Sequence, residues 1–245
     1  MKNMKLLIIA LFAGSLLAGC SKSADPSTTS VVSLKMSATT ATGSPTINGR
    51  VATTVTVTDI TVNVRDIKFD FDKEDEHFKH DSSFVEDHDA KLKGPFILNL
   101  MNAGSFANQV IASVSIPNAK YEKVSFKLVP STASGDMNGK SILMTGTIAG
   151  IPFVFWHNRD TRFGAKQADS TAVVTTGAAV NLAIQLELDK ILSAVNGGVD
   201  LSTAVDGNQD GTITIDPAND DGNKDLADAI MNLLVRHTHC KKEHN

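Results

Sequence analysis

The sequence predicts a mainly β protein, built as an antiparallel β-sandwich that is followed by an acidic loop and one amphipathic helix. Apolar and polar residues alternate along most segments between residues 31 and 190, and these segments are rich in Val, Ile and Thr. A period of two is typical of strands with one buried and one solvated face. Helical segments do not alternate with these strands, so about seven to nine strands at this spacing favour a sandwich over a parallel α/β sheet.

The N-terminal segment indicates secretion. Met1–Lys5 carries two lysines, and Leu6–Leu17 is an apolar run that is too short to span a bilayer, which needs about 20 residues. The run ends in Leu17-Ala18-Gly19-Cys20, which resembles the lipobox of bacterial lipoproteins. The resemblance implies that residues 1–19 are removed as a lipoprotein signal peptide and that Cys20 is lipidated. The alternative is an ordinary cleaved signal peptide that a cysteine happens to follow.

Lipidation of Cys20 makes the membrane the expected partner, because several acyl chains on one residue hold a protein firmly on a lipid surface. Ser21 stands where inner-membrane lipoproteins of Gram-negative bacteria have Asp, so the resemblance implies the outer membrane of the cell envelope. The sequence does not indicate which face of that membrane the protein occupies. Residues 20–30 are small and polar, which predicts a flexible tether between the lipid and the folded domain.

The composition is compatible with a large hydrophobic core and disfavours one class of partner. Hydrophobic residues make up 42% of the chain, close to the average for globular domains. Lys and Arg number 23 against 27 Asp and Glu, which gives a formal net charge of −4. Because the chain is acidic and has no cluster of basic residues, we expect no nucleic acid partner.

The longest predicted strand spans Val51–Asp72, and its apolar face changes register at Arg65-Asp66. A slip of one residue turns the core face of a strand outward unless the backbone bulges or bends. The pattern therefore predicts a bulge or a bend at Arg65-Asp66. The apolar positions on the two sides of the slip are Ile60, Val62 and Val64, then Ile67, Phe69 and Phe71.

Shorter alternating segments complete the predicted sandwich domain, residues 31–195. Val110–Ile116 and Val124–Leu128 flank the turn residues 117–120, which predicts a hairpin with one solvated face. The other segments with strand character are Phe96–Leu100, Ile142–Ile148, Pro152–Trp156 and Val180–Leu188.

Residues 196–236 predict an acidic loop and a helix that packs on the sandwich. The helix is expected at Lys224–Arg236, with Asn223 as its N-cap. Its apolar stripe, at i, i+4, i+7 and i+8, consists of Leu226, Ile230, Leu233 and Leu234. A short helical spacing also precedes the acidic loop, at Ile191, Leu192 and Val195.

The hairpin sequence Ile116–Phe126 resembles a recurring hairpin of uncharacterised bacterial lipoproteins that carry an Ig-like, transthyretin-like domain of unknown function. The resemblance covers roughly residues 31–190. Asn118-Ala119 departs from the Ala-Gly pair that is usual in that group. The resemblance implies a fold and a location, and no active site can be carried over from it.

One acidic segment resembles the calcium-binding loops of EF-hand and dockerin modules. A Ca²⁺ ion needs six to eight oxygen ligands, and such loops supply them from alternate positions around a glycine at the sixth. Gly211 occupies that position, but Pro217 stands where a bidentate acidic residue is expected. The predicted calcium ligands are Asp206, Asn208, Asp210, Thr212 and Asp216. Asp220 and Asp221 beyond the proline are alternatives to Asp216, and the alternative to a calcium site is a solvated acidic loop.

Two histidine-containing segments are candidate sites for Zn²⁺ or copper, because imidazole and thiolate ligands suit these ions. The first segment lies in the acidic stretch of residues 70–89, and the second is a tail at residues 237–245. For both, the alternative is a solvated, charged segment without a metal. The candidate ligands are His77, His80 and His88 in the first, and His237, His239 and Cys240 in the second.

Cys240 has several possible roles. If lipid consumes the sulfur of Cys20, no second cysteine in the chain is left to pair with Cys240. Its sulfur is then a thiol, a metal ligand or a bridge to a second copy.

No nucleophile or metalloprotease motif occurs in the chain, so we do not expect an enzyme. Trp156, His157 and Arg159 lie together at a strand end, where ligands often bind. The alternative role for these three residues is packing. The sequence therefore predicts a lipid-anchored protein that binds or scaffolds an unknown protein or small ligand and carries a structural Ca²⁺. A metal-handling lipoprotein is the main alternative, and an enzyme is the third.

Overall fold

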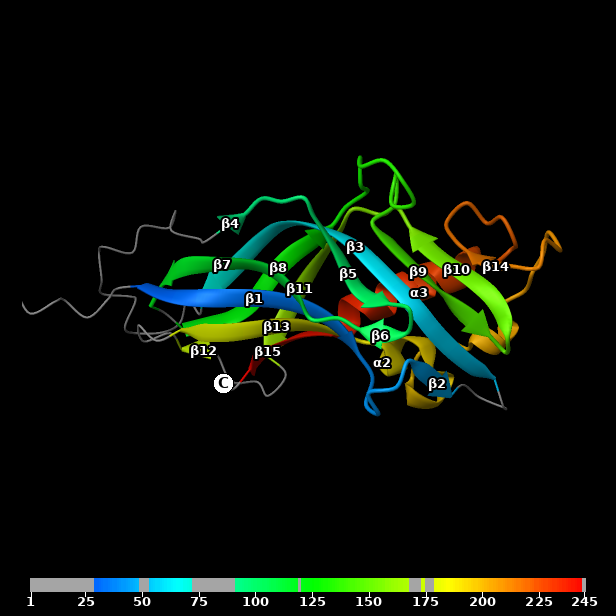
Figure 1. Cartoon of the computed structure of the whole chain (residues 1–245), viewed down its shortest axis with the longest axis horizontal. Coiled ribbons are helices and arrows are strands. Elements are labelled where there is room, and N and C mark those ends of the chain that lie inside the picture. Colours follow the sequence, from blue (N-terminus) through cyan, green and yellow to red (C-terminus); the bar gives the residue numbers. More distant parts are fainter. Residues whose placement is uncertain are drawn as a thin grey trace, which may run out of the picture.

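The computed structural model describes residues 29–48, 53–71, 91–118, 120–167, 173–174 and 179–243. These residues are mainly β, as the alternation predicts, and they form one mixed sheet of fifteen strands with two α-helices (Figure 1). The helices are α2 (Leu188–Leu192) and α3 (Lys224–Arg236), and 3-10 turns lie at Ala194–Asn196 and Leu201–Thr203. The strands are β1 (Thr29–Thr39), β2 (Thr46–Asn48), β3 (Thr54–Phe71), β4 (Lys91–Leu92), β5 (Phe96–Asn102), β6 (Ser105–Phe106), β7 (Gln109–Pro117), β8 (Lys120–Leu128), β9 (Ile142–Ile148), β10 (Ile151–His157), β11 (Thr161–Gln167), β12 (Val173–Val174), β13 (Val180–Glu187), β14 (Ile213–Ile215) and β15 (Thr238–Glu243).

Strand β3 runs through the length of the molecule and pairs with different strands along each half (Figure 1). Its first half pairs with β9 and its second half with β8, while β2, β5 and β4 pair with it on the opposite edge. One arm of the sheet continues from β9 to β10 and β14. The other continues from β8 through β11, β15, β13 and β1 to β7.

The predicted bulge at Arg65-Asp66 is confirmed. Asp66 has a left-handed backbone with φ of 52°, and the pairing of β3 with β8 shifts register between Arg65 and Lys68. The side chains of Val64 and Ile67, on the two sides of the bulge, are both fully buried. The extra residue therefore keeps the apolar face of β3 turned inward along both halves.

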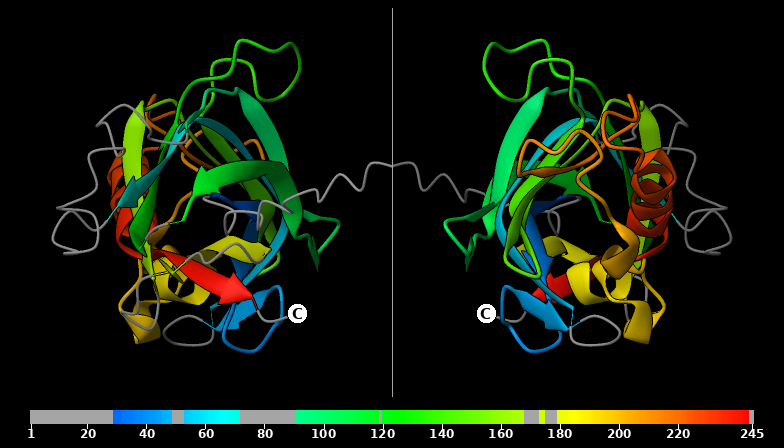
Figure 2. Two further views of the ribbon diagram at one scale, coloured as in Figure 1. Left: turned by 90° about the vertical axis from the view of Figure 1, so that its left-hand side faces the viewer. Right: turned by 90° about the vertical axis from the view of Figure 1, so that its right-hand side faces the viewer.

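The strands curve around a shared interior, with α3 on one side (Figure 2). The core is filled by aliphatic side chains and by phenylalanines, and Phe126 stacks on Phe163 across the β8–β11 pair at 4.9 Å between ring centroids. Helix α3 packs against α2, β10, β11 and β14. Its buried residues are Ala227, Ile230, Met231 and Leu234, so the inward face includes Ile230 and Leu234 of the predicted stripe.

Two expectations about pairing need correction. The sheet is only partly antiparallel, because three of its pairs are parallel: β1 with β13, β10 with β14, and β11 with β15. The predicted hairpin is also absent among the described residues, because β7 pairs with β1 and β8 pairs with β3, β11 and β12. Both edges of β8 are thus occupied along its length, and β7 crosses to another part of the sheet.

Two expectations about the C-terminal helices also need correction. The side chain of Asn223 does not cap α3; the first N–H of the helix, at Lys224, donates to Asn219 Oδ1 at 2.9 Å. The helix at Ile191 and Leu192 ends at Leu192, and Val195 is exposed in the 3-10 turn that follows.

No helix among the described residues is both long enough and apolar enough to cross a membrane.

Gly146 of β9 lies where the backbone of β3 leaves no room for a side chain. A Cβ there would lie 2.0 Å from the carbonyl oxygen of Thr56 and 2.9 Å from the ring of Phe153. We predict that Gly146→Ala lowers the free energy of unfolding by about 1–3 kcal/mol, the usual cost of overpacking. Equilibrium unfolding in urea measures this change.

Gly164→Ala is the matched control for Gly146→Ala. Gly164 also lies within a strand, but its Cβ would meet only the Lys123 side chain at an ordinary 3.7 Å. Its free energy of unfolding should stay the same or rise slightly. Equal destabilisation by both substitutions would contradict the steric explanation.

Candidate metal centre

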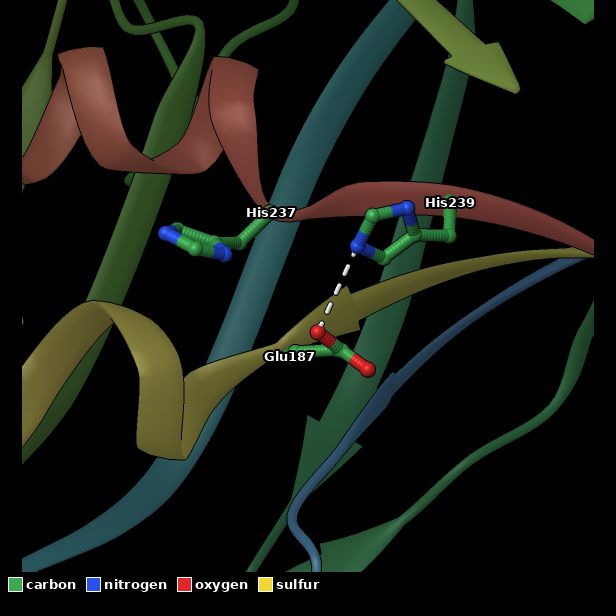
Figure 3. A group of neighbouring side chains, drawn as sticks. All are labelled: Glu187, His237 and His239. Carbon is green, nitrogen blue, oxygen red and sulfur yellow. Dashed lines mark ion pairs between the residues drawn. The ribbon is translucent and has the colours of Figure 1, made fainter. Parts of the chain in front are cut away.

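Three potential metal ligands converge where β13 passes into α2 and α3 passes into β15. We call Glu187, His237 and His239 the C-terminal histidine cluster. One ligand atom from each of the three side chains lies within 4.8 Å of the other two, and His239 Nε2 is 3.4 Å from a Glu187 carboxylate oxygen. Figure 3 shows the His239 ring directed toward the Glu187 carboxylate, with His237 beside them just before β15.

The pairing of β13 with β15 creates this cluster. Leu186 is opposite Thr238 and Gln185 is opposite His239, and the Glu187 N–H donates to the His237 carbonyl at 3.2 Å. In antiparallel strands, directly opposed residues and residues two apart share a face. The three ligands therefore point to the side of the sheet opposite the buried Leu186, Thr238 and Cys240.

The ligand set suits a divalent transition metal ion. Two imidazoles and one carboxylate form a recurrent set for Zn²⁺, with a fourth position left for water or a substrate. The side chains of His239 and Glu187 are 34% and 37% exposed, so the cluster is open to solvent on one side. A site of this kind is accessible to exchangeable ligands as well as to the ion.

Residues 238–243 of the predicted tail form strand β15 of the sheet, which corrects the alternative of a solvated segment at these positions. Strand β15 lies between β11 and β13 and pairs with both. Cys240 is fully buried, on the face opposite the histidines. It is therefore not a ligand of the cluster, and a bridge to a second copy would require β15 to leave the sheet.

Several predicted residues lie outside the described residues. These are Cys20 with the preceding signal segment, most of the acidic stretch of residues 70–89, and His77, His80 and His88. Strand β1 begins at Thr29, two residues before the predicted start of the sandwich domain at residue 31.

The predicted calcium loop has the internal hydrogen bonds that shape a cation-binding turn. The carboxylate of Asp206 accepts from the N–H groups of Asp210 and Gly211, at 3.1 and 2.9 Å. The side-chain oxygen of Asn208 also accepts from Asp210 N–H, and Asp210 accepts from Thr212 N–H at 2.8 Å. Gly211 has a φ of +87°, as the sharp turn requires. The loop then enters β14 instead of a helix.

Buried polar side chains outside the predicted ligand set hold this loop in place. Asp221 is buried and accepts from the N–H groups of Asn208 and Thr214, at 3.1 and 2.6 Å. Asn223, also buried, bonds to both backbone groups of Val205 and to the Thr214 carbonyl. Asp221 and Asn223 thus close the loop at its base.

Asp216 differs from the other acidic residues of the loop because one of its oxygens lacks a partner. Its side chain is fully buried, and Oδ1 accepts from Asn219 N–H at 2.6 Å, whereas the buried Oδ2 has no hydrogen-bond partner. The charge of Asp216 raises the pKa of the neighbouring Asp220 above its usual value. A buried oxygen without a donor is costly unless a cation or water compensates it.

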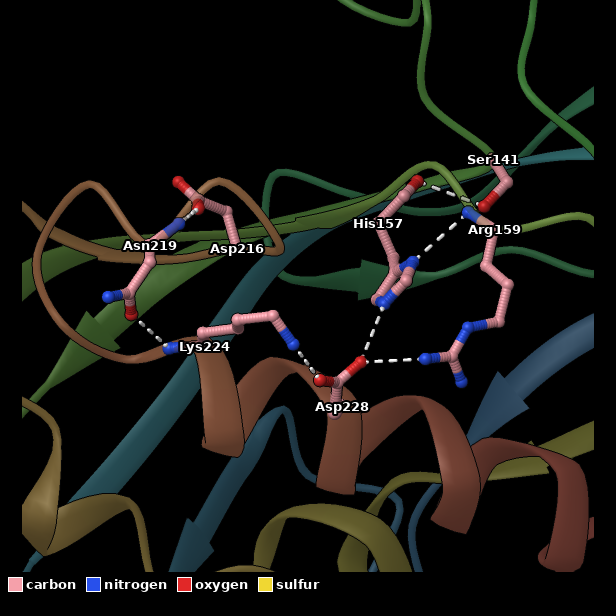
Figure 4. Close-up of polar contacts among 7 residues, drawn as sticks. All are labelled: Ser141, His157, Arg159, Asp216, Asn219, Lys224 and Asp228. Carbon is pink, nitrogen blue, oxygen red and sulfur yellow. Dashed lines mark hydrogen bonds and ion pairs between the residues drawn. The ribbon is translucent and has the colours of Figure 1, made fainter.

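Two of the three residues predicted as a ligand-binding edge, His157 and Arg159, contact α3 instead (Figure 4). His157 is 3% exposed, its Nδ1 accepts from Arg159 N–H at 3.0 Å, and its Nε2 lies 3.4 Å from Asp228 on the helix. Arg159 donates to the same Asp228 oxygen at 2.7 Å, and Lys224 pairs with the other. These contacts favour packing of the helix over ligand binding. Trp156 points elsewhere, with the Lys140 ammonium 5.7 Å from its ring centroid.

Glu187 is the ligand that the sequence does not identify. It belongs to the alternating strand Val180–Glu187, where it looks like an ordinary solvated position. The available signal is the His-X-His spacing of His237 and His239, which on a strand places both rings on one face. The third ligand follows only from the β13–β15 register.

Comparisons with family models, curated proteins and solved structures find no match for this chain.

His157 makes the stability of the protein dependent on pH. Burial lowers the pKa of His157 below 6.5, and the charges of Arg159 and Lys224 add to the effect, while Asp228 opposes it. A depressed histidine pKa means that the unfolded chain binds the proton more readily, so stability falls as the pH drops below about 6.5. We predict a lower melting temperature at pH 5.5 than at pH 7.5, and a smaller decrease for His157→Gln. An equal decrease in both proteins would contradict this role of His157.

Proposed function

We propose that this protein is a lipid-anchored cell-envelope protein that binds a divalent transition metal ion at the C-terminal histidine cluster. The convergence of Glu187, His237 and His239 within 4.8 Å carries the proposal. The lipobox-like Leu17-Ala18-Gly19-Cys20 supports the anchor and the outer-membrane location. The Ig-like, transthyretin-like sandwich is proposed on the mainly β architecture alone, because β7 and β8 do not pair as the resembling hairpin would.

The position of the cluster favours binding or handling of the ion over a purely structural role. The cluster lies on the outer face of the sheet, and the core beneath it is filled by apolar side chains such as Leu186 and Ile184. The backbone groups beside the cluster pair within the sheet. A site that is open to solvent on one side can exchange its ion. Zn²⁺ is the best match to the ligand set, and copper is the alternative.

Removal of a ligand from the cluster should weaken metal binding. We predict that Glu187→Gln and His239→Ala each raise the dissociation constant for Zn²⁺ by at least about tenfold, which even outer-shell substitutions often do. Isothermal titration of tag-free protein with Zn²⁺ and with Cu²⁺ measures the change. Asp189→Asn is the matched control, because it removes a carboxylate two residues from Glu187 without removing a ligand. Absence of metal uptake by the unmodified protein would overturn the proposal.

A binding or scaffolding domain with a structural Ca²⁺ is the second candidate. The unpartnered Oδ2 of the buried Asp216 favours it, together with the preformed turn at Asp206 and Gly211. Asp216 and Asp220 bring two carboxylates into contact, which costs free energy unless one is protonated or a cation lies nearby. The predicted ligands Asp206, Asn208, Asp210 and Thr212 lie on the same loop.

Calcium should stabilise the fold if this second candidate is correct. At a Ca²⁺ concentration of about 100 times the dissociation constant, ligand linkage gives about 2.7 kcal/mol, or a rise of about 5–10 °C in melting temperature. We predict this rise for the unmodified protein and its loss in Asp210→Ala. Asp136→Asn, in an exposed loop away from the site, should keep the rise. Identical melting in Ca²⁺ and in EDTA would exclude a bound Ca²⁺.

A further inference from the structure

A small cavity of about 270 Å³ lies beside the bulge of β3, and we call it the bulge pocket. Its walls come from four strands that are far apart in the sequence: β3, β4, β8 and β11. A hydrogen bond joins the bulge to the segment just after β4: the Asp66 N–H donates to the carbonyl of Lys93 at 3.1 Å. The pocket is therefore a product of the register shift in β3.

The bulge pocket is strongly basic, although the chain as a whole has a formal net charge of −4. Five of the residues that line it are cationic, and the one acidic residue among them is Asp66. Lys91 and Lys93 lie in or beside β4, and each of the other three cationic residues comes from a different strand. The fold therefore gathers these charges, which are not consecutive in the sequence. The cationic residues are Lys68, Lys91, Lys93, Lys127 and Arg162.

The strand pairing places like charges directly opposite one another around the pocket. Lys127 of β8 is opposite Arg162 of β11, and Lys68 of β3 is opposite Lys91 of β4. Such pairs destabilise a sheet. Asp70 lies 3.3 Å from Lys68 and Asp160 lies 3.6 Å from Lys127, which offsets part of the repulsion. A phosphate in the pocket would weaken the repulsion between Lys127 and Arg162 further.

The residue types match a tetrahedral oxyanion. A guanidinium can donate two parallel hydrogen bonds to phosphate or sulfate oxygens, and lysine ammonium groups add mobile point charges around it. Arg162 and Lys93 are both exposed at the rim of the pocket, where such a ligand enters. The volume suits a phosphate group with a small substituent and is too small for a macromolecular strand.

We propose that the bulge pocket is a binding site for a phosphate monoester, with Arg162 as the main recognition residue and Lys93 and Lys127 as supporting cations. The site is separate from the C-terminal histidine cluster and does not depend on a bound metal. The phosphate group comes either from a soluble compound or from a lipid headgroup, since both present the same doubly charged oxyanion.

The first test uses inorganic phosphate as the probe at near-physiological ionic strength. We predict that Arg162→Gln raises the dissociation constant of phosphate by at least about tenfold, the effect of losing a charge-assisted hydrogen bond. Lys166→Gln is the matched control, because Lys166 is exposed four residues along the same strand and does not line the pocket. Isothermal titration measures binding, and melting temperature reports folding. Lys93→Gln, which changes a residue outside the strands, gives a second variant if Arg162→Gln does not fold.

The second test distinguishes the two sources of phosphate. Phosphatidylcholine vesicles with and without phosphatidic acid are sedimented with the protein purified without its lipid anchor. Binding only to vesicles with phosphatidic acid, with release by Arg162→Gln, indicates a headgroup; phosphate binding without vesicle binding indicates a soluble ligand. The proposal is overturned if neither probe binds, or if Lys166→Gln weakens binding as much as Arg162→Gln.

Discussion

An 18-residue strand that twists at every step cannot keep one face buried against a single neighbour along its whole length. β3 meets this constraint with one extra residue at Asp66, which restores the inward direction of its apolar side chains. Just before this bulge, between Val62 and Val64, the partner of β3 changes from β9 to β8, and this change separates the two arms of the sheet. Helix α3 packs against strands of both arms, and the bulge itself shapes the bulge pocket.

Local sequence patterns identify seven of the fifteen strands in the described residues, including the long strands β3 and β13, and miss the short strands as well as β1, β11 and β15. The bulge of β3, the alternation of Val180–Glu187 and the buried Ile230 and Leu234 of α3 all follow from a period of 2 or 3.6 residues. Pairing partners do not follow from such patterns, because periodicity specifies a face and not a neighbour. This explains why the parallel pairs were missed: Val32 and Val180, opposite each other on β1 and β13, belong to distant parts of the sequence.

In the candidate metal centre, too, the sequence pattern does not specify which side chains become neighbours. His237 and His239 attract notice because histidine is rare and metal-binding, whereas Glu187 resembles any solvated strand residue. The three become one site only because β15 fits between β11 and β13 in one particular register. That register also turns Cys240 into the core, so two neighbouring residues with similar affinity for metals have opposite environments.

The place of β15 in the sheet has a consequence for how the chain folds. Residues 238–243 follow all the other strands in the sequence, yet they fill the space between two strands formed by earlier residues. Until they emerge during synthesis, β11 and β13 each present an open edge, and the larger arm of the sheet remains incomplete. Such sequence-distant pairing slows folding, because loop closure costs entropy before any contact compensates it. The nascent chain thus stays incompletely folded until its last strand is available.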